Sequence, residues 1–178
     1  MHFVEKIGKK DKELIKEIGK ELKSPAIKRF LKILTESGST VGALVIIGFI
    51  AAFSDTKALY AMIPVYFFQL AVVEVTKKYF NRNRPNGAIK NILNMKISGG
   101  SFPSGHTSNV FTLAFLISNY YSTSILTTTA LFSMAGLIGL SRVLLGKHYI
   151  GDVAAGAMFG TALSIIGSYL LTVIAPLV

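Results

Sequence analysis

The stretch 103-PSGHTSNVFTLAFLISNYY-121 opens with Pro-Ser-Gly-His and then continues without a lysine, arginine, aspartate or glutamate. A bilayer core of about 30 Å requires roughly 20 predominantly apolar residues in one helix. Further segments of apolar character lie at 38–54, 57–77, 123–142 and 152–175. Because lipid cannot satisfy open backbone polar groups, each segment is expected to be helical. The sequence therefore predicts an all-α integral membrane protein, a bundle of about five transmembrane helices.

The composition also indicates a membrane protein. Hydrophobic residues make up 51% of the 178 residues and charged residues 16%, and the mean hydropathy is +0.53, well above a soluble domain. Cysteine is absent, which excludes disulfides and thiolate chemistry. The N-terminus is charged throughout instead of leading into an apolar segment, so no cleavable signal peptide is expected.

Residues 1–36 form a separate block, which holds ten of the nineteen lysines and arginines and six of the nine acidic residues. Apolar residues at helical spacing end this block, namely Ile27, Phe30, Leu31 and Leu34. We expect amphipathic basic helices in the membrane interface over 1–36, with a transmembrane domain over 37–178. A solvated helical arm without a lipid role is the alternative.

Charged and polar residues recur at corresponding ends of the expected helices. Lys77 ends the second, His106 begins the third, Arg142 ends the fourth and Asp152 begins the fifth. Alternating helices bring all four to one membrane face. Ionisable residues so close to hydrocarbon usually face one another or a polar cavity. The sequence therefore predicts one polar site at this rim.

Basic residues at a helix end also have a plainer interpretation. Taken alone, Lys77, Lys78 and Arg82 are typical of side chains that snorkel to the interface. We do not favour that interpretation for Arg142 and His148.

The polar residues match what a bound phosphate requires, which is several fixed donors around its oxygens. Arg84 and Arg142 supply planar guanidinium groups, and Lys77 supplies a compact positive charge. Ser104 and Gly105 lie where an apolar helix begins, so their backbone N–H groups and the hydroxyl could face an anion. We therefore expect these five residues to bind phosphate.

Two histidines fall in the same motifs. His148 lies one helical turn before Asp152, so the carboxylate is expected to accept a ring N–H and leave the other nitrogen free to attack phosphorus. His106 remains to protonate the departing oxygen and then to activate water. For each histidine taken singly, a structural role is the alternative.

Together these motifs resemble the three-part signature of the type 2 phosphatidic acid phosphatase superfamily. They are Lys77-x6-Arg84-Pro85, Pro103-Ser104-Gly105-His106 and Ser141-Arg142-x5-His148-x3-Asp152. The resemblance implies a phosphatase without metal or cofactor, in which His148 forms a phosphoenzyme, Asp152 orients it and His106 is the general acid and base. It also implies that Lys77, Arg84, Ser104, Gly105 and Arg142 hold the phosphate.

Two further observations concern the metal and the headgroup. Besides Asp152, the one nearby carboxylate is Glu74, and two carboxylates are too few for a two-metal site. Glu74 could equally pair with Lys77, three residues further along the chain.

Lys90 and Lys96, between two motifs, are candidates for recognising the substrate headgroup. The resemblance favours an envelope lipid: lipid A 1-phosphate or undecaprenyl diphosphate equally, then phosphatidylglycerophosphate.

Two other function classes remain open. A lipid phosphotransferase would use the same site with an alcohol in place of water, and a non-enzymatic membrane protein would bind phospholipid without turnover. The expected partners are the lipid substrate and the bilayer, and no nucleic acid. A stripe of small residues in the last span, Gly156, Gly160, Ser164 and Ser168, permits close helix approach, within the chain or in a dimer.

The expected location is the cell (inner) membrane, crossed several times. Two arguments disagree on which side of the membrane holds the site. Ten basic residues precede the first span and eight more lie from Lys77 to Lys147, which by the positive-inside rule puts the site in the cytoplasm. Bacterial members of the family generally act on the outer face, and several of the eight residues belong to the site itself. We therefore expect the periplasmic or extracellular face.

Overall fold

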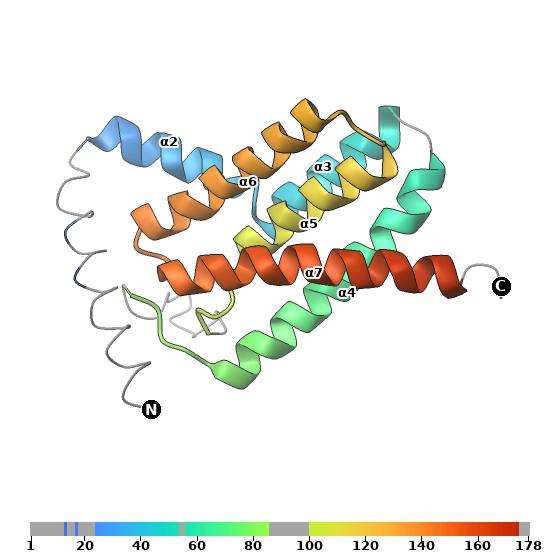
Figure 1. The fold of residues 1–178 in the computed structure, drawn as a ribbon. Coiled ribbons are helices and arrows are strands. Elements are labelled where there is room, and N and C mark those ends of the chain that lie inside the picture. The colour runs from blue at the N-terminus through green and yellow to red at the C-terminus, as the bar shows by residue number, and fades with distance from the viewer. Residues whose placement is uncertain (1–12, 14–16, 18–23, 54–55, 86–99, 175–178) are drawn as a thin grey trace.

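The computed structural model describes residues 13, 17, 24–53, 56–85 and 100–174, and within them every regular element is a helix. The elements are α2 (Pro25–Glu36), α3 (Thr40–Phe53), α4 (Thr56–Phe80), α5 (Gly105–Tyr120), α6 (Ile125–Leu144) and α7 (Ile150–Ile174). Each of the five predicted spans is one of the helices α3 to α7, with its ends moved by three residues or fewer. The all-α fold is therefore confirmed (Figure 1).

Within the described part of the chain, three helices are long and apolar enough to cross a membrane, and the pair α2 and α3, bent by 59°, would together make a fourth crossing. α5, with 16 residues, is shorter than these. Its buried side chains include Thr107, Ser108, Asn109 and Thr112, because other helices surround it and its polar groups bond to protein. Gln69 on α4, for example, donates to the Ser108 hydroxyl at 2.7 Å.

α5 lies at the centre and packs against α3, α4, α6 and α7 (Figure 1). Its approach to α7 is close because α7 presents glycines there. A Cβ atom on Gly156 would come within 2.6 Å of the Ser104 carbonyl oxygen, and one on Gly160 within 2.4 Å of the Ser108 carbonyl oxygen. The small-residue stripe of α7 therefore serves packing within the chain, and it holds the start of α5 against the start of α7.

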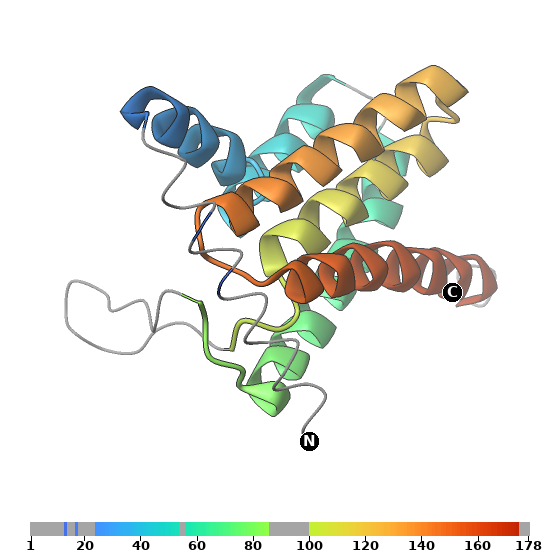
Figure 2. The same cartoon turned by 60° about the vertical axis from the view of Figure 1, so that its left-hand side comes forward.

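α2 is amphipathic and lies beside α6 (Figure 2). Ser24 caps it, with the hydroxyl accepting from the N–H of Ile27, and Pro25 occupies the first turn, where a missing N–H costs nothing. Leu31 and Thr35 are buried, whereas Ile27 and Phe30 are exposed. The predicted apolar stripe is therefore only partly covered by protein. The interfacial position of residues 1–36 stays a prediction, and most of residues 1–23 lie outside the described residues.

Candidate active site

The ends of four helices meet on one side of the bundle, where α4 and α6 finish and α5 and α7 begin (Figure 1). The segment before α5 bonds directly to the start of α7, because the Ser104 N–H donates to the carbonyl oxygen of Asp152 at 2.9 Å. The predicted gathering of Lys77, His106, Arg142 and Asp152 at one rim is found in the structure.

His148 lies in the short connection between α6 and α7. The chain reverses there through Gly146, whose φ of 65° suits a residue without a side chain, and the N–H groups of Lys147 and His148 both donate to the Arg142 carbonyl. The His148 side chain is 2% exposed. Burial lowers the pKa of its imidazole below the ordinary value of 6.5, and Asp152 opposes that effect. The ring is therefore neutral at neutral pH.

The proton of that neutral ring has a defined place. Nδ1 of His148 lies 2.8 Å from the Ser101 carbonyl oxygen, and a carbonyl can only accept, so Nδ1 carries the hydrogen. Oδ2 of Asp152 is farther away, at 3.6 Å from Nδ1, beyond a normal hydrogen bond. The expected acceptor was Asp152, but Ser101 takes this role because α7 begins only at Ile150, so His148 stands outside the helix that holds Asp152. The lone pair remains on Nε2.

Asp152 is fully buried and its two oxygens have other partners. Nη1 of Arg82 donates to Oδ1 at 2.6 Å, and the N–H of Tyr149 donates to Oδ2 at 3.0 Å. The Arg82 guanidinium also lies over the Tyr149 ring, 4.0 Å from its centroid. Sequence reasoning missed Arg82, which it grouped with snorkelling lysines.

Arg82 reaches Asp152 because the chain reverses its direction after α4. Asn81 adopts a φ of 38°, and the Arg82 carbonyl accepts from the Ser101 N–H at 2.7 Å. The chain therefore turns back toward α7 directly after Phe80. The one sequence signal for a role of Arg82 in the site was its position two residues before Arg84. Lys78 lies close to Lys77 in the same motif, so this signal did not distinguish Arg82 from Lys78.

Lys77 and Gly105 lie against each other. A Cβ atom on Gly105 would fall 2.5 Å from Nζ of Lys77, so the absence of a side chain at Gly105 lets the lysine ammonium lie against the first turn of α5. Nζ also pairs with Glu74, the carboxylate one turn earlier on α4. The first N–H groups of a helix have no intrahelical partner, so the start of α5 and Lys77 together form a positive region.

Ser104 was expected to offer both its backbone N–H and its hydroxyl to an anion, and only the hydroxyl remains available. Its N–H is taken by the Asp152 carbonyl, as described above, and its hydroxyl does not cap α5. The hydroxyl accepts from Thr107 at 2.9 Å, which leaves the Ser104 hydroxyl hydrogen for another acceptor. Ser104 is fully buried, so this donor is fixed inside the site.

Two arginines carry donors that lack protein partners. Among the described residues, neither Nε of Arg84 nor Nε of Arg142 has a hydrogen-bond acceptor. Nη1 of Arg142 donates to the Thr35 hydroxyl at 3.1 Å, so α2 also contributes to the site, a contact that the sequence did not indicate. Burial lowers the pKa of Arg84, while Asp152 and Glu74 oppose it. Guanidinium groups with a buried, unpartnered Nε donor are suited to an anion.

His106 belongs to the same group of charges, since Arg142, His148, Lys77 and Arg84 all act electrostatically on its ring. Lys147 adds positive potential nearby: burial lowers its pKa, and Arg142 and Arg84 lower it further. Lys90 and Lys96 lie outside the described residues, so the headgroup hypothesis is untested. Among the described residues, no group of three or more His, Cys, Asp or Glu is placed to hold a metal ion.

The chain is similar in sequence to known proteins. The sequence model of the PAP2 superfamily matches residues 56–174, which include α4 to α7 and all three motifs of the site. The lipid A 1-phosphatase of Porphyromonas gingivalis is 32% identical over 100 residues, which make up 56% of this chain and 20% of that protein. The chain therefore spans about a fifth of the length of this curated relative.

Two solved structures have the same fold. Aquifex aeolicus LpxE aligns with a TM-score of 0.70 and 27% identity over 87% of this chain and 92% of that chain. The first transmembrane PAP2 type phosphatidylglycerolphosphate phosphatase from Bacillus subtilis aligns with a TM-score of 0.77 and 23% identity, over 94% of this chain and 87% of that chain. Together with the apolar helices, these similarities identify an integral membrane protein.

Proposed function

This chain belongs to the PAP2 superfamily, and from that premise we propose that it is a lipid phosphatase that works through a phosphohistidine at His148. One observation carries the proposal. A neutral imidazole, with its proton held on Nδ1 by the Ser101 carbonyl, lies among arginines whose buried Nε donors have no partner in the described part of the chain. A nucleophile and an anion-binding group are thus brought together in one buried place.

The first half of the reaction transfers phosphate to the enzyme. The lone pair on Nε2 of His148 attacks phosphorus in line with the lipid oxygen, the P–O bond to the lipid breaks, and His106 donates a proton to that oxygen. The negative charge of the phosphate favours a protonated His106 beforehand. Asp152, 3.6 Å from Nδ1, stabilises the positive charge that the phosphorylated ring acquires, as the carboxylate of a catalytic triad does for its histidine.

The second half of the reaction regenerates the free enzyme. His106, now neutral, removes a proton from water, the oxygen attacks phosphorus, and the P–N bond breaks to release inorganic phosphate and neutral His148. Lys77, Arg84, Arg142, the Ser104 hydroxyl and the N–H of Gly105 bind the phosphate oxygens through both steps. Lys77, Arg84, Arg142 and protonated His106 supply the positive charge that a metal provides elsewhere, so we infer a reaction without a metal.

The substrates that we propose are lipid phosphates of the bacterial envelope. Lipid A 1-phosphate is supported by the name of the Porphyromonas gingivalis relative. Undecaprenyl diphosphate and phosphatidylglycerophosphate are the alternatives, with Lys90 and Lys96 as candidate headgroup ligands. We place the site on the periplasmic or extracellular face, and labelling of a cysteine introduced at Asn94 in intact cells by an impermeant reagent tests this assignment.

The decisive experiment measures phosphate release by the purified protein in excess EDTA from the three lipids, for wild type and His148→Ala. Wild type should release phosphate from at least one lipid, and the variant should be inactive. Radiolabelled substrate, quenched in the steady state, should leave an acid-labile phosphoenzyme in wild type alone. Asn119→Ala, at the exposed opposite end of α5, is the control and should match wild type. Full activity of His148→Ala would contradict the mechanism.

A further inference from the structure

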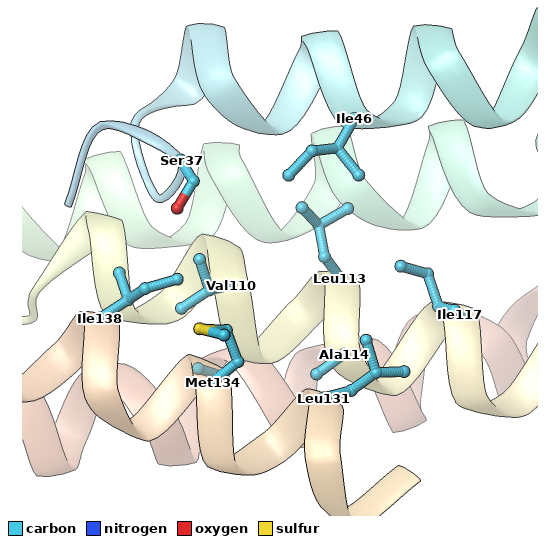
Figure 3. Close-up of a pocket in the computed structure, with 10 residues that line it drawn as sticks. Ser37, Ile46, Val110, Leu113, Ala114, Ile117, Leu131, Met134 and Ile138 are labelled. Carbon is cyan, nitrogen blue, oxygen red and sulfur yellow. The ribbon is translucent and has the colours of Figure 1, made fainter. Parts of the chain in front are cut away.

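A groove of about 230 Å³ lies between α3, α5 and α6, on the side of α5 that faces away from α7 (Figure 3). Apolar side chains form nearly all of its lining, among them Ile46, Val110, Leu113, Leu131 and Met134. The exception is Ser37, whose hydroxyl is already bonded to the Leu34 carbonyl at 2.7 Å. The groove therefore offers hydrocarbon contacts and no polar ligand.

One end of this groove adjoins the candidate active site. Ile138 lines the groove and lies one helical turn before Arg142 on α6. At the same end, Ser37 follows Thr35 by two residues, and the Thr35 hydroxyl accepts from Arg142 at 3.1 Å. This end of the groove is thus formed by residues close in sequence to Arg142 and to its partner Thr35.

Gly38 connects the groove to the second histidine. A Cβ atom there would lie 2.9 Å from Ile138 and 3.3 Å from Val110, both in the lining, and 3.1 Å from the backbone oxygen of His106. Asn109 also donates to the Gly38 carbonyl at 3.2 Å. The turn between α2 and α3 therefore contacts the groove and the site at once.

The groove runs from this end into the depth of the bundle. Val110 and Ile117 are five and twelve residues from the first residue of α5, which at 1.5 Å per residue is about 8 and 18 Å. Figure 3 shows Val110 and Ile138 near one end and Ile117 and Leu131 near the other. Met134 is half exposed, so a chain can enter sideways from the bilayer. The opposite seam of α5 is closed by Gly156 and Gly160, as described above.

A groove lined in this way and open to the bilayer at Met134 favours hydrocarbon over water. We propose that this hydrocarbon is one acyl chain of the lipid whose phosphate occupies the site, an inference that rests on the proposed function. The chain enters past Met134 and packs against Val110, Leu113 and Leu131, which places its headgroup beside Arg142 and His106. The groove thereby selects lipids with long chains over small phosphate esters.

Filling the groove tests this assignment. Ala114 and Ala135 both line it, and Ala114→Leu and Ala135→Leu should lower kcat/KM for long-chain phosphatidylglycerophosphate by about tenfold. The same lipid with six-carbon chains, which does not need the groove, should be hydrolysed within twofold of wild type. Ala130→Leu is the matched control, because Ala130 is exposed on α6, the helix that also holds Ala135. Equal loss for both chain lengths, or no loss for either, would overturn the assignment.

A binding measurement tests this inference separately from the proposed function. It uses the wild-type protein, so it does not depend on whether Ala114→Leu and Ala135→Leu fold. A long-chain phosphatidic acid with a photoactivatable group in mid-chain should crosslink to Leu131 or Met134 of wild type in vesicles. Unlabelled phosphatidic acid should prevent the crosslink, and phosphatidylcholine should not. Crosslinks spread over outward residues such as Leu137, or displaced equally by both lipids, would show ordinary bilayer contact. Absence of phosphate release with specific crosslinking would contradict the proposed function alone.

Discussion

Arg82 and Asp152, 70 residues apart, form a partly buried ion pair in which Nη1 donates to Oδ1 at 2.6 Å. The carboxylate is fully buried and the arginine about one quarter exposed. A buried carboxylate is stable as an anion when it is paired and hydrogen-bonded, and Arg82 together with the Tyr149 N–H meets both needs. Arg82 therefore holds the Asp152 carboxylate at its distance from His148.

Replacing Arg82 should impair turnover without removing phosphate binding. In Arg82→Ala the Oδ1 atom of Asp152 loses its charged partner, so we expect kcat to fall by about tenfold or more and the protein to lose about 1–3 kcal/mol of stability. KM should change little, because Arg82 bonds to Asp152. Steady-state kinetics and thermal unfolding measure both effects.

Lys78→Ala is the control for this prediction, because Lys78 is exposed on the last turn of α4. Arg82→Lys should recover part of kcat, since it restores the charge without the guanidinium geometry. A kcat for Arg82→Ala equal to that of Lys78→Ala would show that the pair has no role in positioning Asp152.

The lowered pKa of His148 predicts the shape of the acid limb of the pH profile. A histidine of ordinary pKa would be half protonated at pH 6.5, and its nucleophilic form would decline there. Because burial lowers this pKa, kcat/KM should stay level through pH 6.5 and fall only at lower pH. Kinetics between pH 5 and 8 with a lipid phosphate provide the measurement. A midpoint at or above 6.5 would count against the buried neutral ring.

The same pKa has a consequence for stability. Below pH 6.5 the unfolded chain binds a proton at His148 before the folded chain does, so the His148 contribution to the free energy of unfolding decreases as pH falls toward the folded-state pKa. Thermal unfolding of wild type should show this loss, and His148→Gln, which has no titrating ring, should show less of it. Identical pH dependence in the two proteins would contradict the prediction.

The contact between Arg142 and Thr35 predicts an effect of α2 on substrate binding. Thr35→Val keeps the shape but removes the acceptor of Nη1, so the guanidinium loses its orientation. We expect KM to rise up to about tenfold, the equivalent of one hydrogen bond, with a smaller change in kcat. Thr35→Ser retains the hydroxyl and should stay near wild type. A Thr35→Val enzyme with unchanged KM would show that Arg142 is positioned by other contacts.

The glycines of α7 predict a packing defect that reaches the site. Gly156→Ala places a methyl group 2.6 Å from the Ser104 carbonyl, so α5 and α7 must separate at a cost of about 1–3 kcal/mol, and turnover should fall. Gly136→Ala is the control, because a Cβ there has nothing within 4 Å. Thermal unfolding and phosphate release distinguish the two. Equal stability of both variants would contradict the close approach of α5 and α7.

Several features of the site could be predicted because they depend on short stretches of chain. The apolar segments predicted the helices, and the alternation of helix ends predicted that His106, Arg142 and Asp152 would meet. Arg82 and Thr35 could not be predicted. Arg82 depends on the turn at Asn81, and Thr35 lies 107 residues from Arg142, with no local pattern to relate them.

The sequence by itself determined the helices, because lipid requires apolar helices of a minimum length, and it predicted a phosphate site from the cations and histidines at their ends. Only the tertiary structure decided which atoms meet. The expected bond from His148 to Asp152 assumed a continuous helix, whereas α7 starts at Ile150 and the Ser101 carbonyl, 47 residues away, accepts the ring N–H at 2.8 Å. A spacing of four residues sets a neighbour only within a helix, and the partner of a buried donor is whichever acceptor the packed chain brings within hydrogen-bond distance.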